Sequence, residues 1–332
     1  MIYINFHNLI GIKIINPTEK VKKFCKSELG YFIQKKKVKT NIQIIFKKKI
    51  NLPKENTFLT SGFYYDSSDK TFYYKKSNNF LSYNLKYYYK DKIFINIEND
   101  FNLWIFLYAI ENTLYFLTSR KKICMLHGGA VSKKDKTHII LGPQGSGKTF
   151  FVLKKINEGY SFLSDEYIFV NKDANCLSFP RPVNFKFYHK NFYKKAFKYY
   201  WNNLKFLSKL KLIFKETLKT LFLRSRWQPM IRLRINKVYP KVLVINKAKI
   251  NVIHSNYKKN ENFNKKVPNL IALQTIIGDI QFEMKNRFYS ILKYINKTND
   301  LFIKKVVNDI KKNEKYKIEI IKSFMYKVRN RI

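Results

Sequence analysis

Short segments in which apolar and polar residues alternate occupy most of the first hundred residues. The two-residue period of half-buried strands recurs over residues 2–6, 42–46, 71–74, 83–89 and 93–97. A nearly continuous apolar stretch at about residues 101–118 then predicts a buried helix, because Glu111 and Asn112 interrupt it and it is too short to span a membrane. We therefore expect a smaller β-rich (α+β) N-terminal domain over residues 1–118 that ends in this helix.

Residues 119–332 have the pattern of a second domain of the α/β class. Short apolar segments predict strands here, and segments with three- and four-residue spacing predict helices. Gly159 is suited to end the first of these helices, because glycine accepts a left-handed backbone. We expect strands at residues 124–126, 160–163, 167–170, 242–245 and 316–321, a hairpin of residues 130–132 and 137–141, and helices at residues 150–157, 268–285 and 300–312.

A basic, aromatic segment at about residues 185–225 predicts a helical insertion in the second domain. Its apolar residues recur at helical spacing at Leu207, Leu210, Phe214, Leu218 and Leu221. A helix that docks on a membrane surface or on a partner protein has this pattern. We favour a helix packed on its own domain with its lysines facing water, because core-facing stripes are the more common case.

The charge of the chain is strongly positive, with 66 Lys and Arg against 22 Asp and Glu, a net charge of +44. The excess is spread along the chain and comes with many Asn, Ile, Phe and Tyr residues, all encoded by A/T-rich codons. Compositional drift explains this better than a dedicated polyanion site, and we do not expect a nucleic-acid partner. Three scattered cysteines and the lack of a secretory leader at the first residues predict a cytoplasmic location.

Residues 142–149 read Gly-Pro-Gln-Gly-Ser-Gly-Lys-Thr and match the phosphate-binding pattern G-x-x-x-x-G-K-[ST] at every fixed position. In such a loop, backbone N–H groups surround phosphate oxygens, the lysine adds a cation and the hydroxyl holds Mg²⁺. A strand is expected before the loop and a helix after it, which is the context the motif requires. ATP and Mg²⁺ are the predicted cofactors, and the predicted cofactor-binding residues are Gly142, Pro143, Gln144, Gly145, Ser146, Gly147, Lys148, Thr149 and Phe150.

Two acids, Asp165 and Glu166, follow the strand that comes after the loop helix. The carboxyl ends of strands in open α/β sheets face the ligand crevice, so one acid could hold the metal and the other take a proton. His127 ends a neighbouring strand, and Arg181 lies between two prolines. Each of these two residues taken alone is more often structural, with Arg181 a surface arginine at a turn.

The order of these motifs resembles that of the HPr serine kinase/phosphorylase family, and more closely its stand-alone kinase-like relatives. The resemblance lies in residues 126–128 (Leu-His-Gly), 142–149, 159–160 (Gly-Tyr), 163–166 (Leu-Ser-Asp-Glu) and 179–182 (Phe-Pro-Arg-Pro). It implies a P-loop kinase-like domain of the HPr kinase C-terminal type. It also implies catalytic roles for Lys148 on the phosphates and for Asp165 as general base with His127 beside it, and metal ligands among Thr149, Asp165 and Glu166.

Glu166 stands where the family usually has Asp, and the glycine-containing signature that supports phosphorolysis has no counterpart downstream. We therefore do not expect the reverse reaction or the HPr substrate. The sequence predicts an ATP- and Mg²⁺-dependent kinase acting on a hydroxyl of a peptide, protein or small molecule. Two alternatives are a nucleotide-binding regulatory module without turnover and a nucleic-acid-stimulated ATPase. Residues 246–249 (Asn-Lys-Ala-Lys) argue against a specific GTPase, because they lack the aspartate that would pair with guanine. A membrane-surface partner through residues 185–225 and homo-oligomers remain open.

Overall fold

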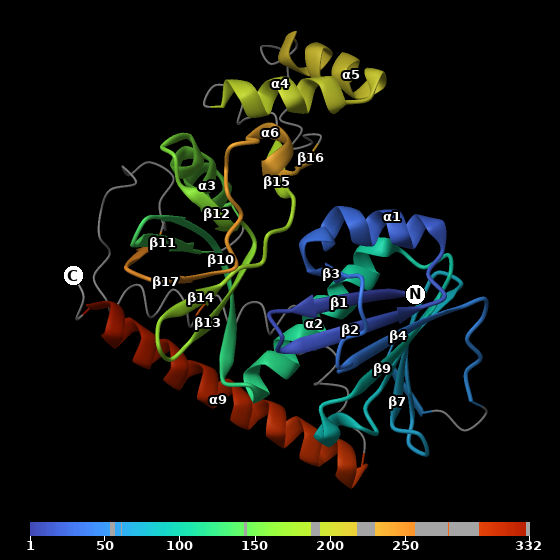
Figure 1. Cartoon of the computed structure of the whole chain (residues 1–332). Helices are drawn as coiled ribbons and strands as arrows, with labels where there is room; N and C mark the ends of the chain where they lie inside the picture. The colour runs from blue at the N-terminus through green and yellow to red at the C-terminus, as the bar shows by residue number, and fades with distance from the viewer. Residues whose placement is uncertain are drawn as a thin grey trace. The chain divides into compact units, whose positions relative to one another are not determined.

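The computed structural model describes residues 1–53, 57–60, 62–142, 145–186, 193–217, 230–255, 278 and 299–329 (Figure 1). The described residues form mixed α/β structure, which confirms the general fold class. Two compact units share the chain. Unit 1 comprises the described parts of residues 1–126, 169–175 and 269–332, and unit 2 those of residues 127–168 and 176–268. The C-terminal residues, which we had assigned to the second domain, thus belong with the N-terminal unit.

Unit 1 contains a nine-stranded sheet in the order β3-β1-β2-β4-β9-β8-β7-β6-β5. The pairs β2–β4 and β4–β9 are parallel, and the other pairs in this sheet are antiparallel. The alternating segments predicted this sheet because every second residue enters the core. The strands are β1 (Ile2–Phe6), β2 (Ile10–Ile15), β3 (Ile33–Gln34), β4 (Ile42–Lys47), β5 (Thr57–Thr60), β6 (Phe63–Asp66), β7 (Thr71–Lys76), β8 (Asn79–Asn84) and β9 (Ile93–Glu98).

The strand predicted at residues 83–89 is wrong. The strand in this region, β8, ends at Asn84, whose side-chain oxygen accepts a hydrogen bond from the Lys86 N–H at 3.1 Å. This local bond turns the chain, and a 3₁₀ helix, η2 (Tyr88–Lys90), follows it. The aromatic residues after Asn84 have the composition of a strand, but the turn at Asn84 ends β8 before them.

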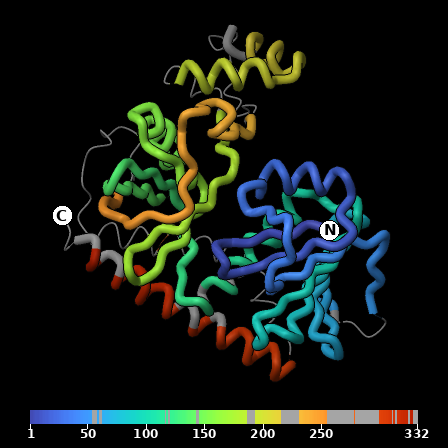
Figure 2. Tube along the Cα trace, viewed as in Figure 1, coloured from blue at the N-terminus to red at the C-terminus, as the bar shows by residue number. Residues whose placement is uncertain are grey.

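Three further helices belong to unit 1: α1 (Glu19–Glu28), α2 (Leu103–Arg120) and α9 (Leu301–Arg329), with a short 3₁₀ turn, η1 (Gly30–Phe32), after α1. The predicted apolar helix is thus confirmed as α2, which contacts α9 (red in Figures 1 and 2). The ammonium of the buried Lys317 on α9 lies 2.8 Å from the ring centre of Tyr115 on α2. Within the described part of the chain, no helix has both the length and the apolar character needed to cross a bilayer.

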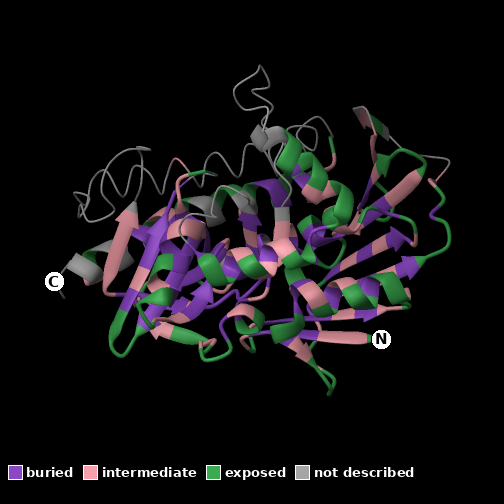
Figure 3. Cartoon of the chain, turned by 90° about the horizontal axis from the view of Figure 1, so that it is seen from above, coloured by how far each residue is buried: buried purple, intermediate pink, exposed green. Residues whose placement is uncertain are grey.

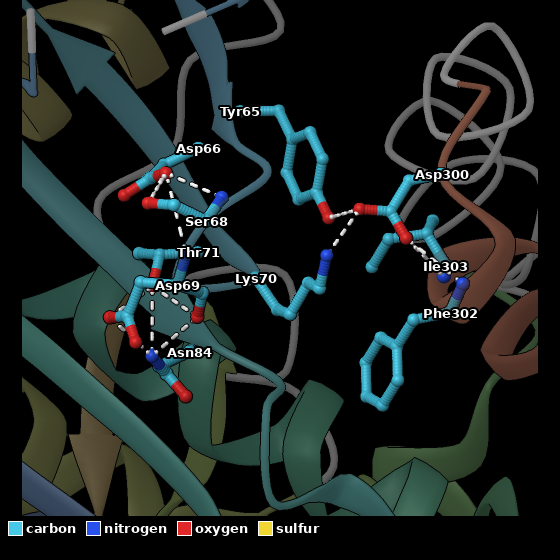
Figure 4. Close-up of polar contacts among 10 residues, drawn as sticks. All are labelled: Tyr65, Asp66, Ser68, Asp69, Lys70, Thr71, Asn84, Asp300, Phe302 and Ile303. Carbon is cyan, nitrogen blue, oxygen red and sulfur yellow. Dashed lines mark hydrogen bonds and ion pairs between the residues drawn. The ribbon is translucent and has the colours of Figure 1, made fainter. Parts of the chain in front are cut away.

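One carboxylate fixes the start of α9 (Figure 4). Oδ1 of Asp300 accepts hydrogen bonds from the N–H groups of Phe302 and Ile303, at 2.9 and 3.3 Å. Oδ2 accepts from the Tyr65 hydroxyl at 2.7 Å and from the Lys70 ammonium at 2.8 Å. Asp300 therefore caps the helix and ties it to the sheet, a long-range contact that periodicity does not reveal.

The last strand, predicted at residues 316–321, is wrong because these residues continue α9. The buried apolar residues of α9 recur at helical spacing. They are Ile303, Val306, Val307, Ile320 and Ile321. The helix predicted at residues 300–312 is confirmed but is longer than expected. The helix predicted at residues 268–285 lies outside the described residues, apart from residue 278.

A second sheet has the order β17-β14-β13-β10-β11-β18, and β12 pairs with β10. The expected hairpin is confirmed, with Ser132 opposite Thr137. The buried strand predicted at residues 242–245 is wrong, because only Val244 bridges to Phe162 and Leu243 is 69% exposed. The strands are β10 (Ile123–Lys133), β11 (Lys136–Leu141), β12 (Ser161–Ser164), β13 (Tyr167–Asn171), β14 (Asn175–Leu177), β17 (Lys247–Lys249) and β18 (Val252–Ser255).

The remaining elements of unit 2 are α3 (Lys148–Asn157), the strand pair β15 (Val183–Lys186) and β16 (Met230–Leu233), α4 (Lys194–Asn203), α5 (Phe206–Thr217) and α6 (Ile235–Val238). They share one core, to which both helices and strands contribute buried residues (purple in Figure 3). The helical insertion is thus confirmed in α4 and α5. The packing expected for its stripe is wrong: Leu207, Leu210 and Phe214 are exposed, and Leu212 enters the core instead. Leu218 and Leu221 lie outside the described residues.

Candidate phosphate-binding site

The phosphate-loop motif lies between β11 and α3, as its sequence context predicted. Gly145 and Gly147 have φ angles of +89° and +87°, a left-handed backbone that side chains rarely adopt. Gly147 precedes the first turn of α3 and accepts a hydrogen bond from the Phe151 N–H at 3.0 Å. Among the described residues no side chain caps α3, and its first turn has no acidic residue. The amides of that turn therefore point their partial positive charge at the loop.

Two further glycines on β10 allow close packing, one against α3 and one against β11. A Cβ atom on Gly129 would lie 2.6 Å from Cγ2 of Val152 on α3. A Cβ atom on Gly128 would lie 2.8 Å from the carbonyl oxygen of Ile140 on β11. The contacts leave no room for a side chain at either position, so Gly129 permits the close packing of α3 on β10, and Gly128 permits the close approach of β10 to β11.

Lys148 opens α3 and is only 7% exposed. Its ammonium donates a hydrogen bond to the carbonyl oxygen of Gly142 at 2.5 Å, which holds the cation across the loop. The hydroxyl of Ser146 is buried and has no hydrogen-bond partner among the described residues. Pro143 and Gln144, also predicted to bind the cofactor, lie outside the described residues. The described part of the loop thus contains a cation, the amides of the first helical turn and a buried hydroxyl.

Asp165 lies opposite the start of α3, just after β12. Its Oδ2 accepts a hydrogen bond from the Thr149 hydroxyl at 2.9 Å. The residue is 8% exposed, and its Oδ1 is buried with no hydrogen-bond partner among the described residues. The structure thus brings Thr149 and Asp165 together, as the sequence predicted. A buried carboxylate oxygen without a hydrogen-bond donor is expected to bind a cation or a proton.

Burial raises the pKa of the Asp165 carboxyl from 3.8 to about 6. The Thr149 hydrogen bond and the charges of Lys148 and Arg232 oppose this rise, and the charge of Glu166 adds to it. Arg232 on β16 also donates a hydrogen bond to the Asn184 side chain on β15 at 2.6 Å. No sequence signal singles out Arg232, because it stands in an alternating basic and apolar segment like many others in this chain.

The second acid, Glu166, is engaged differently. Its Oε2 lies 3.3 Å from Nη1 of Arg181, which is only 4% exposed. The expectation of a surface arginine is therefore wrong. The segment before Arg181 is held inward because the Ser164 hydroxyl donates a hydrogen bond to the Phe179 carbonyl oxygen at 3.0 Å. The proline-flanked segment is thus part of the interior around the two acids.

His127 and Phe150 complete the predicted site residues. The His127 ring centre lies 5.7 Å from that of Tyr167, and the next residue, Gly128, donates its N–H to the Glu166 carbonyl oxygen at 3.0 Å. The backbone thus places His127 beside the acid pair, and its catalytic role stays a prediction. The carbonyl oxygen of Phe150 accepts a hydrogen bond from the Tyr193 hydroxyl at 2.6 Å, which links α3 to the segment before α4.

The oxygen atoms near the loop fit a magnesium ion. Mg²⁺ in nucleotide sites is held by one or two protein oxygens together with phosphates and water. Because Thr149 donates its hydroxyl hydrogen to Asp165, the lone pairs of that hydroxyl face away from the carboxylate and can bind a cation. Clusters of three or more His, Cys, Asp or Glu residues suited to a metal are absent from the described residues.

A scan of the chain against models of known protein families finds no match, and no curated protein is significantly similar to it. The resemblance to HPr kinases therefore stays a prediction carried by the motifs.

Proposed function

We propose that the chain is an ATP- and Mg²⁺-dependent phosphotransferase that phosphorylates a hydroxyl group of a peptide, a protein or a small molecule. The observation that carries the proposal is the 2.9 Å hydrogen bond between Thr149 and the buried Asp165, beside the ammonium of Lys148. It joins the predicted metal-binding hydroxyl to a carboxylate at the positive end of α3. Phosphoryl transfer needs mainly positioning and neutralised charge, which these groups supply.

Phosphate binding would rest on Lys148 and the first-turn amides of α3. The ammonium would move from the Gly142 carbonyl oxygen to the β- and γ-phosphates, exchanging a neutral partner for a charged one. Bound Mg²⁺ would neutralise the phosphate oxygens further. The Thr149 hydroxyl would hold the ion through its lone pairs while still donating its hydrogen to Asp165.

Asp165 would serve as the general base through Oδ1, the oxygen without a hydrogen-bond donor. A pKa of about 6 leaves the carboxylate mostly ionised at pH 7.5, yet basic enough to take the proton of an attacking hydroxyl. Glu166, paired with Arg181, would keep a negative charge next to Asp165 and so hold its pKa up. The acceptor would then approach from the side of the acid pair.

The test is transfer of labelled γ-phosphate from ATP to acceptors in a lysate of the source cells, with phosphosites read by mass spectrometry. Asp165→Asn should bind ATP but lose about 10²–10⁴-fold in transfer rate, whereas Asp135→Asn, in the exposed turn between β10 and β11, should transfer normally. Lys148→Met should lose both binding and transfer. Transfer at the wild-type rate by Asp165→Asn would refute the base assignment, and undiminished transfer by Lys148→Met would refute the proposal.

A nucleotide-binding module without turnover is the second candidate. The Glu166–Arg181 ion pair favours it, because one of the two acids already has a protein cation as its partner. This candidate predicts ATP binding that depends on Lys148, no phosphorylated product, and a partner captured only when nucleotide is present.

A further inference from the structure

The helix α5 carries an apolar face that points away from its own domain. Phe206, Leu207, Leu210, Ile213 and Phe214 are all exposed. At 3.6 residues per turn they cover an arc of about 120° on the helix. Leu212 lies on the opposite side and is buried in the core of unit 2 together with Tyr200 of α4. The helix is therefore fixed through one side, while its larger apolar side faces solvent.

Lysines border this apolar face. Lys209 and Lys211 fall on its two edges, and Lys194, Lys195 and Lys198 are exposed on α4. Residues 194–217 contain seven lysines and one acidic residue, Glu216. Figure 1 shows α4 next to α5, and the Lys209 ammonium lies 5.8 Å from the ring centre of Trp201 on α4. An apolar arc between cations, with an aromatic residue at its border, is typical of helices that lie in a membrane interface.

We propose that the exposed face of α5 docks on an anionic membrane surface, with Leu207, Leu210 and Phe214 in the acyl boundary and the lysines on lipid phosphates. Charge and apolar area favour an anionic membrane over a second copy of the chain or a nucleic acid. A second copy of the chain would bring the two lysine sets against each other, and like charges oppose docking. A nucleic acid would engage the lysines but would leave the apolar arc in water.

The experiment is flotation of the full-length protein with two kinds of vesicle, pure phosphatidylcholine and phosphatidylcholine with about 30% phosphatidylserine. We expect binding to the anionic vesicles that weakens as salt is raised. Leu207→Glu should lower the partition coefficient about tenfold or more, since it removes apolar area and adds a negative charge. Leu243→Glu is the matched control, because Leu207 and Leu243 are both 69% exposed and Leu243 lies outside α5.

A second readout locates the face directly. In Leu210→Trp protein, brominated lipids should quench the new fluorescence, whereas in Leu243→Trp protein they should add nothing to the quenching seen in wild type. Three outcomes would overturn the proposal. They are no binding to anionic vesicles, equal loss of binding in Leu207→Glu and Leu243→Glu, and wild-type dimers that Leu207→Glu dissociates while lipid binding persists.

Discussion

Replacing Asp165 with asparagine should stabilise the folded protein at neutral pH. The structure gives the reason: burial raises the pKa of this carboxyl from 3.8 to about 6, so the ionised form is disfavoured in the fold. A difference of about two pKa units at ~1.4 kcal/mol each amounts to roughly 3 kcal/mol. Asparagine removes the charge and still accepts the Thr149 hydrogen bond, but its NH₂ group needs a new partner. The net gain at pH 8 should therefore be about 1–3 kcal/mol.

The sign of the pH dependence follows from proton binding. Between pH 4 and 6 the folded state holds the Asp165 proton more tightly than the unfolded state, so stability falls as pH rises through this window. The loss of unfolding free energy caused by the ionised Asp165 is complete above about pH 7 and nearly absent at pH 4. Asp165→Asn should thus be no more than slightly different in stability from wild type near pH 4, where only the cost of its NH₂ group remains, and should exceed wild type increasingly towards pH 8.

The assay is urea unfolding of both proteins at several pH values, with Asp135→Asn as a control for the charge change alone. Comparing variant with wild type cancels other titrating groups, such as the stacked pair His138 and His254. Burial lowers the pKa values of both histidines, that of His254 to about 4. The reasoning is refuted if Asp165→Asn is less stable than wild type at pH 8, or if the difference in stability does not change with pH. Either result would mean that the ionised Asp165 carboxylate does not destabilise the folded state.

Two further predictions concern packing and capping. Gly129→Ala should destabilise by about 1–3 kcal/mol in urea unfolding, because its Cβ would lie 2.6 Å from Val152, whereas Gly30→Ala, with nothing within 4 Å, should have little effect. Wild-type stability of the Gly129→Ala protein would mean that α3 does not pack on β10 as described. Asp300→Ala should speed amide hydrogen exchange in the first turns of α9, because it removes both the cap and the Lys70 ion pair. Equal exchange in variant and wild type would show that Asp300 does not hold the helix.

Features that depend on neighbouring residues could be predicted from the sequence. The strand, loop and helix around Lys148 and the hairpin of β10 and β11 are set by local spacing and by glycines. Thr149 and Asp165 come together because one helix and one short strand separate them. The motif could therefore predict which side chains meet at the loop.

Features that depend on distant residues could not be predicted. Arg232 lies near Asp165 only because β16 pairs with β15. Arg181 is buried because a serine hydroxyl on β12 holds the segment before it. On α5, helical spacing showed that an apolar face exists, but not that Leu212 on the other side would be the residue entering the core. The spacing of residues sets which side chains share a face, and tertiary contacts set where that face points.

The most direct test of the account is calorimetric titration of the purified protein with ATP, with and without Mg²⁺, in wild type and in Lys148→Met. We predict that wild type binds Mg²⁺·ATP, and that both removal of the metal and the Lys148 substitution weaken binding at least tenfold. Equal affinity in wild type and Lys148→Met, or no binding to wild type, would contradict the assignment of residues 142–149 as a phosphate-binding loop.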